Sequence, residues 1–116
     1  MDTILVLDDE LNNLNVISLL LRARGFDVLE ASSGEEAIKV SSNHFGPIPL
    51  VVADLQLGTS SGADVAVELI DFRPEMSVLF TSGTPLNGWE DRDRHLFDSF
   101  PPNAVGFLEK PFCERA

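Results

Sequence analysis

The stretch Ile4-Leu5-Val6-Leu7-Asp8-Asp9-Glu10 decides the fold, because a short apolar run passes directly into three acidic residues. The stretch Leu50-Val51-Val52-Ala53-Asp54 repeats this pattern. Apolar runs that do not alternate with polar residues are typical of parallel strands covered on both faces. Ligands of open parallel sheets bind outside the carboxyl ends of the strands, and both stretches place carboxylates there.

Helical patterns separate these two strands from three others. Strands are predicted at residues 26–30, 78–80 and 104–108, and the alternating pattern of the first indicates an edge strand. Helices are predicted around residues 14–21, from the Ser33 and Glu36 capping box through residue 40, before Pro74, and from about residue 89 to residue 100. The alternation predicts an α/β fold with a doubly wound five-stranded parallel sheet, in one domain that spans residues 1–116. With the strand order 2-1-3-4-5, the first and third strands are neighbours.

The composition excludes several classes of function. Eight Lys and Arg against nineteen Asp and Glu give a net charge of −11, which disfavours direct binding to nucleic acid or to an anionic membrane surface. The single cysteine, Cys113, excludes an internal disulfide and a CxxC metal site. No apolar run approaches the roughly 18 residues of a membrane span. The N-terminus lacks the basic start of a signal peptide, so we expect a cytoplasmic protein.

Polar residues follow four of the five predicted strands. They are Asp8 and Asp9, Asp54, Thr81 and Lys110. Each like-charge pair of carboxylates at about 4 Å repels by roughly 4 kcal/mol at an effective dielectric near 20, so a proton or a divalent cation must relieve the cluster. Oxygen ligands of this kind suit Mg²⁺. Together with an ammonium and a hydroxyl, the cation provides what an incoming phosphoryl group needs, so the residues predict Mg²⁺-assisted phosphoryl transfer to an aspartate.

Taken together, these stretches resemble the response-regulator receiver domain of two-component signalling. The matching segments are, in chain order, residues 4–10, residues 51–57, Gly62, residues 79–83 and residues 107–112. The resemblance implies a flavodoxin-like sheet and a phosphorylation-activated signalling receiver. It implies that Asp54 accepts a phosphoryl group from a sensor histidine kinase or a histidine phosphotransfer protein.

The resemblance also implies a role for each residue of the cluster. Asp9 would bind Mg²⁺ directly, with Asp54 and the backbone carbonyl of Gln56, and Asp8 would act through a metal-bound water. Lys110 would pair with Asp54 and then with the phosphoryl oxygens. Thr81 would form a hydrogen bond with the phosphoryl group, and Phe107 would be the aromatic switch. The Lys110–Pro111 bond would be cis. Such a domain is no enzyme beyond self-phosphorylation from small donors and autodephosphorylation.

Two features depart from the family pattern. Gly58 stands where the family usually has proline, which should loosen that loop without removing a ligand. The chain stops at Ala116, so the fifth helix is expected to be missing or truncated. That would leave half the residues of two central strands facing water. We therefore expect the chain either to form a homodimer through this face or to be a fragment whose native chain supplies the cover.

Three other functions fit parts of the pattern. A haloacid-dehalogenase-like phosphohydrolase uses a similar set of residues, but its nucleophile ends the first strand in an Asp-x-Asp motif, and it needs a capping domain. Flavodoxin-type cofactor binding needs a phosphate-cradling loop where Asp8-Asp9-Glu10 would repel phosphate. A receiver-shaped interaction module that no longer uses phosphate stays open as the main alternative, although all the expected site residues are present.

Overall fold

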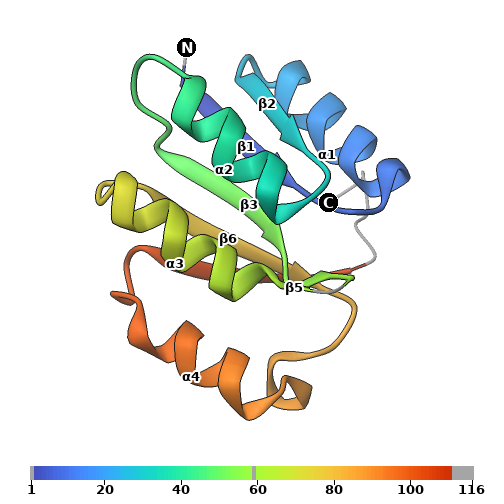
Figure 1. Ribbon diagram of the computed structural model, residues 1–116. Coiled ribbons are helices and arrows are strands. Elements are labelled where there is room, and N and C mark those ends of the chain that lie inside the picture. Colours follow the sequence, from blue (N-terminus) through green and yellow to red (C-terminus); the bar gives the residue numbers. More distant parts are fainter. Residues whose placement is uncertain (1, 59, 111–116) are drawn as a thin grey trace.

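A five-stranded parallel sheet forms the centre of the molecule (Figure 1). The computed structural model describes residues 2–58 and 60–110. The sheet has the order β2-β1-β3-β6-β7, which confirms the predicted order of the five strands and the edge position of residues 26–30. Its strands are β1 (Thr3–Leu7), β2 (Asp27–Ala31), β3 (Leu50–Asp54), β6 (Ser77–Ser82) and β7 (Val105–Glu109).

Helices cover both faces of this sheet (Figure 1). The helix α1 (Leu11–Ala23) packs on one face, and α2 (Gly34–Asn43), α3 (Gly62–Phe72) and α4 (Asp91–Ser99) lie on the other. Ser33 caps α2, because its Oγ accepts a hydrogen bond of 3.1 Å from the Glu36 backbone. The Glu36 carboxylate in turn accepts a hydrogen bond from the Ser32 N–H. In a standard capping box, it would accept from the N–H of the capping residue itself, which is Ser33 here.

The segment after β3 is more ordered than the sequence indicated. Two short antiparallel strands, β4 (Gln56–Leu57) and β5 (Ser60–Ser61), form a hairpin where we expected a looser loop. Gly58 lies between them with φ +70°, a value that proline cannot adopt, because its ring holds φ near −65°. The glycine therefore permits a turn that the proline of the family pattern would exclude.

An aromatic cluster fills the space between the sheet and α4. Trp89 is 7% exposed and stands before α4 rather than in it, because a short 3₁₀ turn, η1 (Leu86–Gly88), precedes the helix. The Trp89 ring lies 6.0 Å from Phe80 and 5.2 Å from Phe107, both edge to face. Phe97 in the last turn of α4 and Phe100, which follows the helix, complete the cluster. These rings link β6 and β7 to α4.

The face that carries α1 is less open than expected. Val52 is only 5% exposed, because it packs in one cluster with Leu14 and Ile17 of α1. Leu79 is half-buried, and Leu108 is 46% exposed. On this face, exposure to water is thus concentrated at β7. The prediction that half the residues of β3 and of β6 would face water was wrong for β3. The expected cis bond at Pro111 and the expected absence of a helix in residues 111–116 fall outside the described residues.

No helix within residues 2–58 and 60–110 combines the length and the apolar character that crossing a membrane would require.

Gly62, the first residue of α3, permits a close approach of two backbone segments. Its N–H donates a 2.7 Å hydrogen bond to the Leu55 carbonyl, and a Cβ built on it would lie 2.0 Å from the carbonyl oxygen of Asp54. Gly62→Ala should therefore lower the free energy of unfolding by about 1–3 kcal/mol, as overpacking does elsewhere. Urea denaturation measures this loss. Gly83→Ala is the matched control, since a Cβ there meets nothing within 4 Å; equal losses in both variants would contradict the explanation.

Candidate functional site

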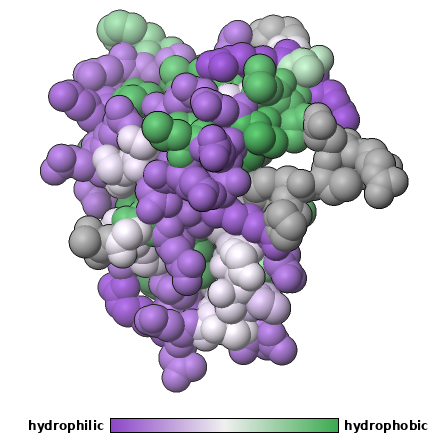
Figure 2. Space-filling model, turned by 90° about the vertical axis from the view of Figure 1, so that its right-hand side faces the viewer, coloured by the Kyte–Doolittle hydropathy of each residue, from purple (hydrophilic) through white to green (hydrophobic). Residues whose placement is uncertain are grey.

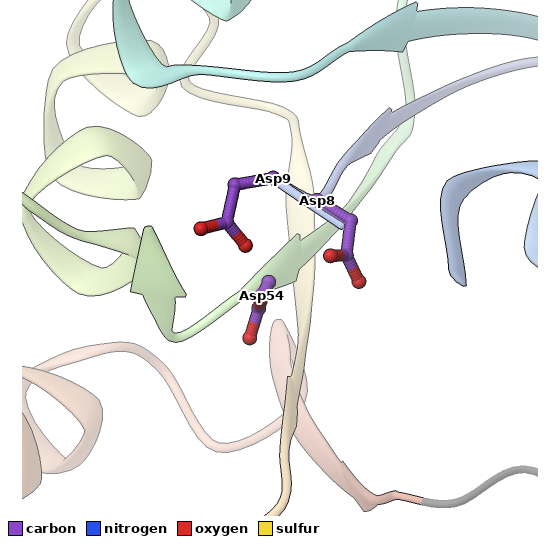
Figure 3. A group of neighbouring side chains, drawn as sticks. All are labelled: Asp8, Asp9 and Asp54. Carbon is purple, nitrogen blue, oxygen red and sulfur yellow. The ribbon is translucent and has the colours of Figure 1, made fainter. Parts of the chain in front are cut away.

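The carboxyl ends of four strands bring the predicted polar residues to one edge of the sheet. Asp8 and Asp9 follow β1, Asp54 ends β3, Thr81 lies in β6 and Lys110 follows β7. Figure 3 shows Asp8 and Asp9 leaving the end of β1 beside Asp54. One oxygen from each of the three carboxylates lies within 4.8 Å of the other two. The structure thus confirms that the acidic residues converge, as the strand order predicted.

The alternation of side chains along the strands explains why three of these residues meet. Val6, Val52 and Leu79 all pack on the α1 face. Residues two positions further along each strand share that face, and the Asp54–Thr81 register pair lies level in neighbouring strands. Asp8, Asp54 and Thr81 therefore lie on one side of the sheet edge.

Lys110 joins two of the carboxylates. Its Nζ lies 3.2 Å from Asp54 Oδ2 and 3.4 Å from Asp8 Oδ2. The Lys110 backbone N–H donates a 2.7 Å hydrogen bond to the Ser82 carbonyl, which extends the β6–β7 pairing to the lysine. The Lys110 side chain is mostly buried, with 18% of its surface exposed.

The two buried aspartates have matching partners: one oxygen of each faces Lys110, and the other accepts a hydrogen bond from the backbone N–H two residues further on. Asp8 is fully buried, and its Oδ1 accepts a 2.9 Å hydrogen bond from the Glu10 backbone just before α1. Asp54 is 4% exposed, and its Oδ1 accepts a 3.2 Å hydrogen bond from the Gln56 backbone. Asp9, by contrast, is exposed. Asp8 therefore helps to start α1 as well as contributing charge to the cluster.

The charges of the cluster change the proton affinities of Asp54 and Lys110. Burial and then the nearby Asp8 carboxylate raise the pKa of Asp54 to about 6, although Lys110 and the Gln56 backbone lower it. Burial lowers the pKa of Lys110, but the carboxylates of Asp54 and Asp8 outweigh burial and raise it. The site thus holds more negative charge than its one ammonium can neutralise.

A divalent cation fits this imbalance. Within the described part of the chain, Asp8 Oδ2 has no hydrogen-bond partner and is left with its ion pair to Lys110. Asp9 is exposed and adjacent, and all the charged ligands are oxygens, which suits Mg²⁺. The Gln56 N–H donates to Asp54, so the backbone of Gln56 borders the cluster; the Gln56 carbonyl stays a predicted ligand.

Thr81 and Phe107 lie on opposite faces of the sheet. Thr81 is buried on the side of the carboxylates, and its Oγ1 finds no hydrogen-bond partner in residues 2–58 and 60–110. Phe107 is half-buried and lies opposite Phe80 in the pairing of β7 with β6. Phe80 directly precedes Thr81 in β6, so its side chain points to the other face of the sheet. Phe107 contacts the Trp89 ring rather than the carboxylates. Sequence reasoning identified both residues but did not predict Trp89 as the neighbour of Phe107.

An open cleft of 1070 Å³ extends from the cluster. It runs past Asp54 and Lys110 between the β4–β5 hairpin and the start of α4, where Trp89 and Arg92 line it. Seen from this end, the surface is largely hydrophilic (Figure 2). The cluster is therefore accessible to a polar ligand from solvent.

Comparison with known proteins gives one consistent result. The sequence model of the response regulator receiver domain family matches residues 4–116. The sensor kinase CckA of Brucella abortus is 33% identical over 93 residues, which are 79% of this chain and 9% of the kinase. The aerobic respiration control protein ArcA of Escherichia coli is 32% identical over 97% of this chain and 43% of its own. The chain thus spans less than half the length of either relative.

A solved structure supports the same assignment. The response regulator TrrA of Thermotoga maritima, crystallised in complex with Mg²⁺ and BeF, superimposes with a TM-score of 0.73 at 26% identity. The match covers 97% of this chain and 89% of TrrA.

The raised pKa of Asp54 predicts how stability depends on pH. In the folded protein the pKa is about 6, above its ordinary 3.8, so the folded state binds this proton more tightly than the unfolded chain. The resulting stabilisation is fully present below pH 3.8 and is lost as the pH rises through about 6. In metal-free buffer, the free energy of unfolding should therefore fall between about pH 4 and pH 7 by up to about 3 kcal/mol more than in Asp54→Asn. Parallel pH profiles of the two proteins would contradict the raised pKa.

Proposed function

Because the chain belongs to the response regulator receiver domain family, we propose that Asp54 accepts a phosphoryl group from a histidine kinase or a histidine phosphotransfer protein. Phosphorylation-activated signalling is the activity of this family. The observation that supports Asp54 as the acceptor is its position: it alone among the three aspartates both lines the cleft and lies against Lys110, because Asp8 does not line the cleft and, among the described residues, the Lys110 ammonium pairs with Asp54 and Asp8 only. The receiver domain extends over residues 1–116 in this proposal.

The residues of the site provide each part of the transfer. An Asp54 carboxylate oxygen attacks the phosphorus of a phosphohistidine, a new O–P bond forms, and the N–P bond breaks with the electron pair leaving on the imidazole. Lys110 Nζ, already between Asp54 and Asp8, remains beside the phosphoryl oxygens and balances their charge. The unpartnered Thr81 hydroxyl donates to one of those oxygens. Asp9, Asp54 and the Gln56 carbonyl would hold a Mg²⁺ ion, with Asp8 acting through a water, and the ion would supply electrostatic stabilisation of the transferring group.

The signal leaves the site through the opposite face of the sheet. Movement of Thr81 toward the phosphoryl group shifts β6, and Phe80 is the next residue along that strand. The rings of Phe80 and Phe107 both contact Trp89, so the aromatic cluster repacks and α4 responds. Phe107 is the aromatic switch in this proposal.

The alternatives are less consistent with the geometry. A dehalogenase-like hydrolase would place its nucleophile at the end of β1, where Asp8 is fully buried. A phosphate-independent module has no need of a mostly buried lysine that bridges two carboxylates. It also has no need of a buried aspartate whose pKa stays raised despite that lysine. We therefore propose no turnover of a separate substrate, only self-phosphorylation from small donors and autodephosphorylation.

The charge of the protein indicates the kind of partner it binds. With a net charge of −11 and the exposed Asp9 and Glu10 beside the cleft, the donor protein should present basic residues around its phosphohistidine. Direct contact with nucleic acid or with an anionic membrane is not part of the proposal, and a kinase donor that uses ATP places the chain in the cytoplasm.

The identity of the acceptor can be tested directly. Acetyl phosphate with Mg²⁺ should add one phosphoryl group to the intact protein, because a small donor needs only the site residues. Asp54→Asn should abolish this mass gain, whereas Asp71→Asn, which changes an exposed aspartate of α3, should leave it unchanged. Intact-mass spectrometry followed by peptide mapping measures both. Labelling that persists in Asp54→Asn, or in excess chelator, would contradict the proposed site.

Homodimer formation through the α1 face stays a prediction. Leu108 is 46% exposed beside the half-buried Leu79, which supports a contact there, while the net charge of each copy opposes it. Pairing should therefore increase with ionic strength, which screens the repulsion. Light scattering over a concentration series should show the pairing, and Leu108→Glu should abolish it. Phe72→Glu, at an exposed phenylalanine that ends α3 on the opposite face, is the control; a wild type that stays monomeric at high salt would end this prediction.

A further inference from the structure

A polar bridge joins the β4–β5 hairpin to α4. Ser61, which ends β5, donates a 2.7 Å hydrogen bond from its Oγ to Asp93 Oδ1 in the first turn of α4. The same Oγ accepts a 3.1 Å hydrogen bond from the Ala63 backbone and so caps α3. One side chain therefore connects the hairpin, the start of α3 and the start of α4.

A second contact lies beside the first. Arg92 Nη1 is 2.6 Å from Asp64 Oδ2, which again joins the first turns of α4 and α3. These two side chains are 68% and 43% exposed, so this pair alone contributes little. Ser61–Asp93 is partly buried and is the main element of the bridge.

Both structures that the bridge joins have few other supports. None of the residues of α4 is buried, and the helix is held to the sheet by partly buried rings. The hairpin strands have two residues each and are linked through Gly58 at positive φ, so the hairpin has little stability of its own. Each depends on the other through the bridge.

The hairpin also borders the cluster of carboxylates. Gln56, the first residue of β4, donates its N–H to Asp54, and a Cβ on Gly58 would lie 3.9 Å from Asp9 Oδ2. A ligand that orders the carboxylates therefore orders the hairpin, and Ser61 carries that order to Asp93. This route uses neither Thr81 nor Phe107.

We propose that Asp93 is a positioning residue that, through Ser61, couples occupancy of the Asp54 site to the placement of α4. The proposal rests on the proposed function, because it takes the carboxylate cluster as the site of Mg²⁺ and the phosphoryl group. Coupling between two sites is reciprocal, so loss of the bridge weakens binding at the site as well as the response of α4. For a partly exposed bridge, we expect about a two- to fivefold loss of affinity.

Beryllofluoride with Mg²⁺ is the probe, followed by two readouts. The fluorescence of Trp89, the single tryptophan, gives the affinity, and hydrogen exchange of residues 91–99 gives the response of α4. In the wild type, binding should slow exchange in α4. Asp93→Ala should weaken binding about two- to fivefold and remove most of that slowing. Asp93→Asn should restore both, because the amide oxygen still accepts from Ser61.

Two further variants complete the design. Asp91→Ala removes an exposed acid from the same turn of α4 and should behave as the wild type. Arg92→Ala removes only the flanking pair and should have a smaller effect than Asp93→Ala. If Asp93→Ala binds beryllofluoride with wild-type affinity and slows hydrogen exchange in α4 as the wild type does, the proposed role of the bridge is overturned and the proposed function is not. A wild type that does not bind beryllofluoride, or an Asp54→Asn variant that binds it equally well, would instead overturn the proposed function.

Discussion

The ammonium of Lys110 is the contact on which the site depends. It lies between two buried carboxylates, at 3.2 Å from Asp54 and 3.4 Å from Asp8, and no single positive charge can balance three acidic groups. The residual imbalance is visible in the raised pKa of Asp54, even with a lysine and a backbone N–H in contact with it. The need for further positive charge is what the proposed Mg²⁺ would meet, and it distinguishes the cluster from a set of helix caps.

The fold places this unfavourable cluster where stable parts of the structure support it. Leu5, Leu7 and Phe80 are fully or almost fully buried, so the core anchors β1 and β6 just before the positions that carry Asp8 and Thr81. The close approach of Gly62 to the Asp54 carbonyl brings the start of α3 against the end of β3. Burial of apolar side chains in the sheet thus provides the stability that the charged edge lacks.

The sequence predicted the parts of the structure that follow from periodicity. Continuous apolar runs identified the buried strands, and the strand order then predicted that Asp8, Asp9 and Asp54 converge. The pairing of Lys110 with Asp54 followed from the family resemblance. The β4–β5 hairpin was not predicted, because two-residue strands carry no pattern that differs from a loop. The burial of Val52 was also missed, since it depends on how far Leu14 and Ile17 of α1 reach across the sheet, and helix patterns do not specify that distance. The Ser61–Asp93 bridge joins residues 32 positions apart, and only the packed structure shows it.

The most direct test of the account is a ¹³C NMR titration of the Asp54 carboxyl group, followed against pH with and without Mg²⁺. Without the metal, the account predicts a titration near pH 6, well above the ordinary 3.8, because burial and Asp8 disfavour the charged form. Saturating Mg²⁺ should lower this value strongly, because the cation binds only the deprotonated carboxylate. A titration near 3.8 that Mg²⁺ does not move would contradict the claim that an uncompensated carboxylate cluster defines the site.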